Sequence, residues 1–194
     1  MYRKSELLNR WFVILSLLLA IKSGAVKAQT QYQIPKHEVN LNLANTLIIA
    51  SVEVGYKYFI DYDQSLGVRL LINERRNFRH KKSEDKYNTQ AVRLDYSYYF
   101  GRDNPGSGFY IQPMIKYRFG DFKETKTLDW GQKVKRKTDM NSFIAAIGVG
   151  YEWNISNSFV FGPFVNIGRN FSKEVKNRFS MFEFNAGFDI GYRF

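Results

Sequence analysis

The last sixteen residues, Phe179–Phe194, alternate strictly between two kinds of side chain. Counted back from the end, one set is apolar or aromatic: Phe194, Tyr192, Ile190, Phe188, Ala186, Phe184 and Phe182. The residues between them are small, polar or charged apart from the first: Met181, Glu183, Asn185, Gly187, Asp189, Gly191 and Arg193. Successive side chains of a β-strand point to opposite faces. This segment therefore predicts an amphipathic strand whose apolar face meets either a protein core or lipid.

Seven further segments show the same alternation, separated by turn residues or charge clusters. They are Glu38–Asn45, Val52–Ile60, Ser65–Glu74, Thr89–Phe100, Phe109–Phe122, Asn141–Ile155 and Phe159–Phe171. Together with the last segment they predict an all-β fold, an eight-stranded antiparallel up-and-down transmembrane barrel. Pro113 and Pro163 fall on apolar-face positions, where each removes a ladder hydrogen bond. A bulge or a position near a strand end would tolerate them.

The N-terminus predicts a secretory signal peptide over residues 1–28. A basic leader is followed by the eleven-residue apolar run Trp11–Ile21 and by small or apolar residues at Val26-Lys27-Ala28. Eleven residues are too few for a helix that crosses a bilayer. The mature chain, residues 29–194, is then a single barrel domain. With no cysteine in the chain, lipoprotein acylation and disulfides are excluded.

The lengths of the connections predict the orientation of the barrel. Those at 61–64, 101–108 and 156–158 are short and are placed in the periplasm, whereas those at 75–88, 123–140 and 172–178 are mostly longer and are placed outside. Thr46–Ser51, a short apolar connection on the outer side, does not fit this pattern. Its extension of the first strand into a tight hairpin is one interpretation.

The polar faces of the segments carry a balanced set of charges. The predicted inward residues are Glu38, Asn40, Asn42, Glu53, Lys57, Arg69, Asn73, Arg93, Asp95, Lys116, Arg118, Glu152, Asn154, Asn166, Glu183, Asn185, Asp189 and Arg193. Six of them are acidic and six are basic, as a narrow interior requires, because pairing offsets the cost of burying a charge. In a soluble ligand-carrying barrel the apolar faces would point inward instead.

The charge outside the strands is basic. The outer regions Glu74–Asn88, Asp121–Met140 and Ser172–Arg178 together carry +7, which is the net charge of the whole mature chain. Such a rim suits the phosphates and acidic sugars of outer-membrane lipid and lipopolysaccharide. Binding of a specific polyanion or host surface by the loops is the sharper alternative. Aromatic residues gather near both ends of the apolar faces and predict two interface girdles.

The chain ends on an aromatic residue, Phe194, with Tyr192 at the third position from the end. This ending resembles the C-terminal strand of bacterial outer-membrane barrels, which the barrel-assembly machinery recognises. The whole mature chain is similar to the small eight-stranded outer-membrane barrels of Gram-negative bacteria, the OmpA/OmpX-like superfamily. The first hairpin, EVNLNLANTL followed by VEVGYKYFIDYDQSLGVRL, resembles a subgroup without an assigned function. The resemblance implies the fold and the outer membrane, and transfers no site residue.

The residues indicate no catalytic, cofactor-binding or metal-ligating site. His37 falls at the periplasmic start of the first strand, and His80 lies in a basic run without a paired serine and acid. Gly148-Val-Gly150 is a strand pair rather than a phosphate loop, and nucleic acid is not an expected partner. We expect a monomeric, non-enzymatic barrel without a large pore, in a structural or surface-interaction role. A lipid A-modifying enzyme and a narrow transporter of small hydrophobic molecules are the alternatives.

Overall fold

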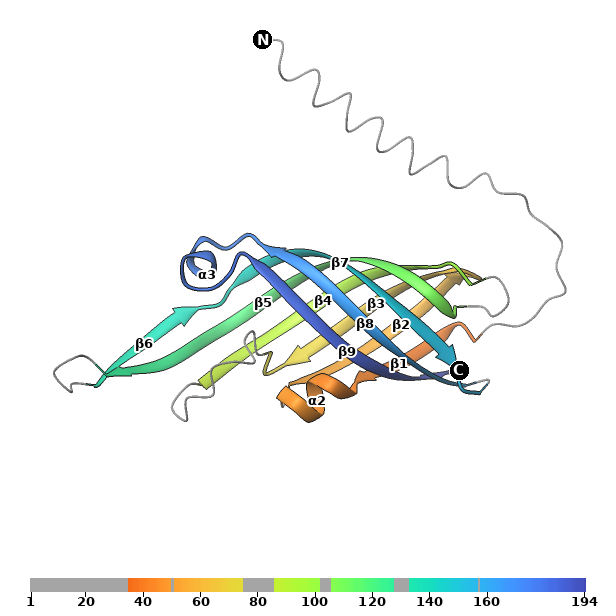
Figure 1. Ribbon diagram of the computed structural model, residues 1–194, viewed down its shortest axis with the longest axis horizontal. Helices are drawn as coiled ribbons and strands as arrows, with labels where there is room; N and C mark the ends of the chain where they lie inside the picture. The colour runs from red at the N-terminus through yellow and green to blue at the C-terminus, as the bar shows by residue number, and fades with distance from the viewer. Residues whose placement is uncertain (1–34, 50, 75–85, 102–105, 128–132, 157) are drawn as a thin grey trace, which may run out of the picture. The chain divides into compact units, whose positions relative to one another are not determined.

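A computed structural model describes residues 35–49, 51–74, 86–101, 106–127, 133–156 and 158–194, shown in Figure 1. The predicted signal peptide and His80 lie outside these residues. The strands are β1 (His37–Asn42), β2 (Val52–Asp61), β3 (Gln64–Ile72), β4 (Lys86–Tyr99), β5 (Gly108–Thr127), β6 (Lys133–Asp139), β7 (Ser142–Asn154), β8 (Phe159–Asn170) and β9 (Phe182–Arg193). Two short helices, α2 (Leu43–Ile49) and α3 (Lys173–Arg178), complete the described elements. Neither has the length and hydropathy of a membrane-spanning helix.

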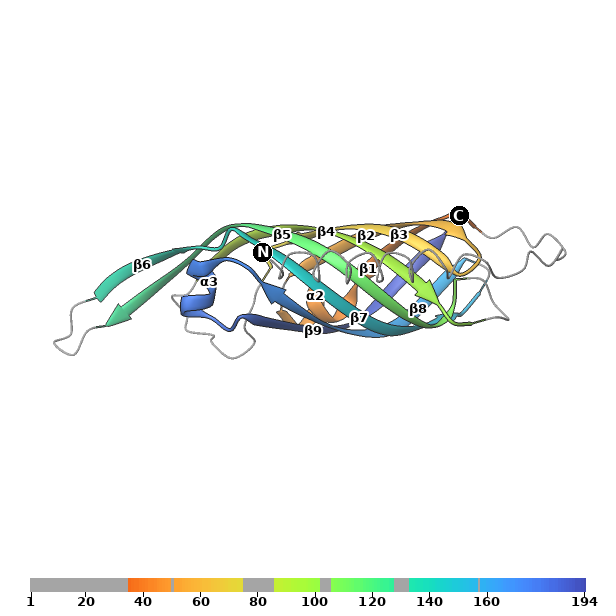
Figure 2. The same cartoon turned by 90° about the horizontal axis from the view of Figure 1, so that it is seen from above.

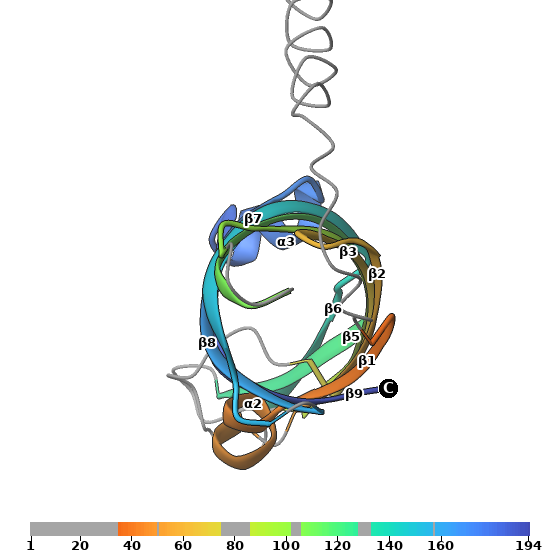
Figure 3. The same ribbon diagram turned by 90° about the vertical axis from the view of Figure 1, so that its right-hand side faces the viewer.

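The strands form one antiparallel sheet that closes on itself. Their order is β4-β3-β2-β1-β9-β8-β7-β5-β6, and an additional pairing of β4 with β5 completes the ring, which Figure 3 shows end-on. Strand β6 pairs only with the last part of β5, from Asp121 to Thr127, and therefore lies outside the ring. The wall consists of eight strands, which confirms the predicted eight-stranded barrel.

The alternation in the sequence becomes the two faces of the wall. Along β2 every second side chain from Glu53 to Phe59 is buried, and those between are exposed. The exposed apolar side chains form a belt around the outside, with Ile72 54% and Phe184 65% exposed. Rings meet at the two ends of this belt, for example Phe159 with Tyr192 and Phe143 with Phe171. The polar faces point into the barrel, so the membrane-barrel reading is confirmed over that of a soluble carrier.

The predicted outer connection 123–140 is largely a β-ribbon. Strand β5 runs on to Thr127 and pairs with β6, so that Lys123 lies opposite Lys137 and Glu124 opposite Arg136. The two strands project beyond the barrel wall, as Figure 2 shows. The predicted connection 172–178 contains α3, whose first turn is capped by the side chain of Ser172. Val175 of α3 packs in an apolar cluster with Phe122, Met140 and Phe179.

The puzzling connection Thr46–Ser51 is mostly helical. The first strand ends at Asn42, three residues earlier than expected, and α2 follows at once. The side chain of Asn42 accepts a hydrogen bond from the backbone N–H of Asn45 (3.1 Å), which is the geometry of a helix N-cap. Thr46 Oγ1 donates back to the carbonyl of Asn42 (2.8 Å). The hairpin interpretation was wrong because an asparagine cap stops the strand and starts a helix.

Both prolines lie within strands rather than near their ends. Pro113 keeps its register with Ile147 of β7, but the β4–β5 register breaks off opposite it, between Asp95 and Tyr98. Pro163 behaves in the same way: it pairs with Phe188 of β9, whereas the β7–β8 register is interrupted between Gly150 and Trp153. A proline has no N–H to donate. Each is therefore tolerated by interrupting the ladder on one side only.

Candidate functional site in the barrel interior

The interior is the part of the molecule where chemistry-bearing side chains gather. Most of the predicted inward residues are buried there: Glu38, Asn40, Asn42, Glu53, Lys57, Arg69, Arg93, Asp95, Arg118, Glu152, Asn166, Asp189 and Arg193. Lys116, Glu183 and Asn185 are half-buried in the same interior. Asn154 is exposed at the end of β7, but its Oδ1 accepts a hydrogen bond from Nη1 of the inward Arg193 (3.1 Å). Inward glutamine, serine and aromatic side chains, which the charge pattern did not include, fill the rest.

At the periplasmic end, two cations and two carboxylates form one cluster. Lys57 Nζ lies 2.9 Å from Glu38 Oε1 and 2.5 Å from Glu152 Oε2. Arg193 Nε donates to Glu38 Oε2 (2.9 Å), and its Nη2 pairs with Glu152. These residues come from four strands, including the first and the last. The cluster therefore joins the two ends of the sheet at the seam where β1 meets β9.

The same mouth is filled by aromatic rings and by a turn. Phe59, Tyr99, Tyr110 and Phe164 form a buried cluster. Gly106, in the connection predicted as a plain periplasmic turn, is buried against the ring of Phe59. Arg193 Nη2 donates to the carbonyl of Gly106 (2.6 Å), and the guanidinium lies 4.7 Å from the centre of the Phe59 ring. The turn thus folds into the barrel mouth, where the C-terminal strand holds it.

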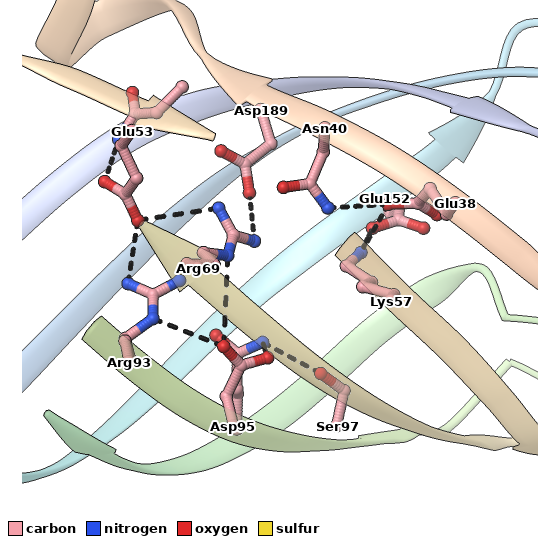
Figure 4. A network of polar contacts seen from close by, with 12 residues as sticks. Glu38, Asn40, Glu53, Lys57, Arg69, Arg93, Asp95, Ser97, Glu152 and Asp189 are labelled. Atoms are coloured by element: carbon pink, nitrogen blue, oxygen red, sulfur yellow. Dashed lines mark hydrogen bonds and ion pairs between the residues drawn. The ribbon is translucent and has the colours of Figure 1, made fainter. Parts of the chain in front are cut away.

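The middle layer is centred on two arginines from neighbouring strands, drawn in Figure 4. Arg69 Nη2 donates to Asp189 Oδ2 (2.6 Å). Arg93 Nη1 lies 2.9 Å from Glu53 Oε1, and Arg93 Nε donates to Asp95 Oδ2 (3.3 Å). The second oxygen of Asp95 accepts from the side-chain amide of an inward glutamine on β5 (2.9 Å). Each charge in this layer meets an opposite charge, which is the condition for keeping it buried.

The outer layer contains a carboxylate that was predicted at the end of the third strand segment, in the outer basic region, and not among the inward residues. Glu74 is buried and bonds to Arg118 Nε (2.7 Å) and Lys116 Nζ (2.5 Å). Both cations also reach Glu183, at 2.6 Å from Arg118 and 3.1 Å from Lys116. By plain alternation Glu74 would share the outward side of Ile72. The residue between them, Asn73, has a positive φ of 58°, which breaks the alternation and turns Glu74 inward. Asparagine tolerates this conformation better than most residues, so Asn73 was the only sequence clue.

A cavity of about 50 Å³ remains in the outer half of the interior. Its lining residues are Asn45, Ser51, Leu71, Glu74, Arg93, Met114, Lys116, Arg118, Ile144, Ala146, Asn166, Gly168, Glu183, Phe184 and Asn185. Among the described residues, no group of three histidine, cysteine or acidic side chains is placed to hold a metal. His37 bonds to the hydroxyl of Tyr56 (2.6 Å) and stacks on Phe194, at the periplasmic rim where the sequence placed it. The described side chains of the interior can therefore form hydrogen bonds and ion pairs.

Comparison with solved structures finds matches at low sequence identity. The N-terminal β-barrel domain of Pseudomonas aeruginosa OprF is 15% identical, with 83% of this chain and 98% of that chain covered and a TM-score of 0.47. The attachment invasion locus protein Ail of Yersinia pestis is 11% identical, with 81% and 93% covered and a TM-score of 0.39. Neisserial surface protein A is 8% identical, with 81% and 94% covered and a TM-score of 0.40. No curated protein sequence matches the chain.

One family model matches, the autotransporter β-domain, over residues 45–173. This range includes β2 to β8 and covers about two thirds of the chain. The matched strands carry the exposed apolar belt and the charged interior, which are the two faces of a barrel that sits in an outer membrane. The protein is thus an outer-membrane β-barrel of a Gram-negative bacterium, and by this match the chain belongs to the autotransporter β-domain family.

Proposed function

We propose that this protein is a closed, non-enzymatic outer-membrane barrel that serves a structural or surface-interaction role and conducts no large solutes. The observation that supports it most directly is the filled interior. Eight strands enclose a space that side chains can just fill, and here charged pairs occupy it in three successive layers. A solute would have to break buried ion pairs, each of which is costly to separate.

Conductance in planar bilayers tests this directly. The full chain, refolded and reconstituted, is compared with a general porin in the same bilayer and salt. We expect no steps of porin size, because the turn at Gly106 and the aromatic cluster around Tyr99 close the periplasmic mouth. Steps comparable to those of the porin would overturn the proposal.

The non-enzymatic part of the proposal has its own test. The rival is a lipid A-modifying enzyme, and the residue nearest to that chemistry in the sequence, His80, lies outside the described residues. Mass profiles of lipid A from cells with and without the protein separate the two ideas. We expect identical profiles, and the loss or gain of an acyl chain would favour the enzyme.

The partner proposed for the outer surface is lipopolysaccharide. On one face of the β5–β6 ribbon, Lys123 and Lys137 lie directly opposite each other, and Lys135 follows on the same face. All three are exposed, and among the described residues only Lys123 has a carboxylate partner, Asp121 at 3.3 Å. A strip of like charges across two strands is unfavourable unless anions neutralise it.

Binding of the purified barrel to lipopolysaccharide vesicles at rising salt tests this partner. We expect affinity to fall with salt and to fall several-fold in Lys135→Gln/Lys137→Gln, because surface charges are screened over about 10 Å at 0.1 M. The matched control is Lys36→Gln, an exposed lysine at the periplasmic end. Equal binding by both variants would reject the lysine strip as the contact. Recognition of the last strand by the assembly machinery and a monomeric state remain predictions.

A further inference from the structure

The barrel wall is incomplete in its outer half, at the seam between the first and last strands. Strand β1 ends at Asn42, which lies opposite Asp189. Strand β9 begins seven residues earlier, at Phe182. Among the described residues, the edge of β9 that faces β1 has a strand partner only from Asp189 to Arg193. From Phe182 to Phe188 this edge has none, which leaves a notch in the wall.

The notch lies at the depth of the membrane. The outward side chains of β9 along it are Phe182, Phe184 and Phe188, at 47–65% exposure, and they continue the apolar belt. A strand needs about 9–11 residues to cross the bilayer core, and β1 has six. Backbone groups facing hydrocarbon are tolerated only where protein covers them or where they line a cavity. Something must therefore cover this edge.

Helix α2 occupies the notch. It contacts β9 on one side and β2 on the other, and its place beside them is visible in Figure 1. Its Asn45 turns inward and donates to Glu53 Oε2 (2.9 Å), whereas Leu47 is 79% exposed. The helix is only seven residues long. It is held to the interior through the side chains of Asn42 and Asn45.

The interior cavity reaches this notch. Its lining includes Asn45 of α2 and Ser51 after it, together with Phe184 and Asn185 from the part of β9 that has no pairing with β1. Asn166 lies on the neighbouring strand β8, directly opposite Asn185. It is buried to about nine tenths, and its Nδ2 has no hydrogen-bond partner in the described part of the chain. A buried donor without an acceptor is costly. The cavity thus presents an unused donor, and with Asn45 Oδ1 an unused acceptor, to whatever enters beside α2.

We infer that the notch is a lateral binding site for a single-chain anionic amphiphile, such as a fatty acid, which enters from the membrane beside α2. The carboxylate would take the place next to Asn166 and Lys116, and the chain would remain against Phe184 and Leu47 in the lipid. A volume of about 50 Å³ admits a head group of this size and little more. Three cations and two carboxylates line the cavity, namely Arg93, Lys116, Arg118, Glu74 and Glu183, which favours an anion over a cation.

The site is a dead end. Beneath it, the pairs of Arg69 with Asp189 and of Arg93 with Glu53 close the interior. A ligand could therefore bind without crossing the barrel, so this site and the absence of conductance are separate claims that fail separately.

A diazirine analogue of palmitate tests the site on the full chain in non-ionic detergent. After photolysis, we expect the label in peptides that contain residues 43–47 and 182–188. Excess palmitate should compete and hexadecyltrimethylammonium should not. Labels spread evenly around the apolar belt would show partitioning into the detergent shell only and would overturn the proposal, as would equal competition by the ammonium amphiphile.

Two variants and a matched control sharpen the result. Ala146→Leu fills the cavity and should lower labelling of these peptides at least tenfold. Ala145→Leu is the control, since this neighbour lies on the outward face of the same strand and should label as the native chain does. Folding of each variant is checked by the difference in gel mobility between unboiled and boiled samples. If Ala146→Leu does not fold, Asn166→Asp is used instead, because it keeps the size of the side chain and replaces the donor by an anion. Undiminished labelling of a folded variant of either kind would reject the site.

Discussion

The two halves of the interior are built differently, although one sheet surrounds both. The periplasmic half is densely filled: Lys57 and Arg193 join two carboxylates, and four aromatic rings and a turn close the mouth. The outer half has a comparable ion-pair cluster around Arg118, but it retains a cavity and an unpartnered donor on Asn166. Close packing supports stability, whereas unfilled polar space supports binding.

The difference follows from where the chain begins and ends its wall. Strands β1 and β9 pair from Glu38 to Asn42, at the periplasmic side. There the sheet is complete and every strand contributes inward side chains. Above Asn42 the wall relies on α2 in place of a longer β1, and a cavity remains in the interior beside it. We therefore expect substitutions in the periplasmic half to affect folding and those in the outer half to affect binding.

The largest effect is expected for Arg193→Met. This change leaves Glu38 and Glu152 buried with only Lys57 between them. Removal of one partner from a buried ion pair costs about 3–5 kcal/mol. Unfolding by guanidinium in detergent, followed by the heat-shift of gel mobility, measures the loss. Arg169→Met is the control, because this exposed arginine on the outer face stacks on Phe171 and has no carboxylate partner among the described residues. Equal stability of the two variants would contradict the importance of the periplasmic cluster.

A smaller contrast is expected when an inward side chain is enlarged in each half. In Gly150→Ala the new Cβ would meet the ring of Tyr110 and lie 2.8 Å from the carbonyl of Pro163, so overpacking should cost about 1–3 kcal/mol. Ala146→Leu adds three carbons toward the outer cavity and should leave the unfolding midpoint unchanged or slightly raised. The same guanidinium titration measures both. A larger loss in Ala146→Leu would show that the outer half is as tightly packed as the periplasmic half.

The sequence predicted some features of these two halves and missed others. Period-2 alternation predicted the wall, its two faces and most of the charged interior, because alternation is a property of each strand alone. The inward position of Glu74 was not predicted, because one residue with a positive φ, Asn73, changes the face on which the next side chain lies. Helix α2 was not predicted, because its N-cap, Asn42, also continues the alternation of β1. The Gly106 turn depends on contacts with Arg193, far along the chain, which no local pattern records.

Asn42→Ala tests how firmly the outer notch is covered. The side chain caps α2 and also donates to Glu53 Oε2 (2.9 Å). Loss of a helix cap costs about 0.5–2 kcal/mol. We expect the free energy of unfolding to decrease by an amount in that range. We also expect faster hydrogen exchange at residues 43–47, measured by mass spectrometry. Thr125→Ala, in the ribbon outside the wall, serves as the control. Unchanged exchange in Asn42→Ala would mean that α2 does not depend on this cap.

The smallest effect is expected in the β5–β6 ribbon, which belongs to neither half of the interior. Lys137→Thr removes one of two lysines that lie directly opposite each other. Like charges in such a pair are unfavourable by less than about 1 kcal/mol. Substitutions on an exposed surface usually change the free energy of unfolding by no more than about 0.5 kcal/mol. The barrel of this variant should therefore unfold at the same guanidinium concentration as the native chain. The ribbon should become slightly more stable, which is measurable as slower hydrogen exchange at residues 122–125. A destabilisation of 1 kcal/mol or more, on the scale of these estimates, would mean that the ribbon supports the wall. The contrast would then no longer separate two halves of one interior but would extend to a third element outside it.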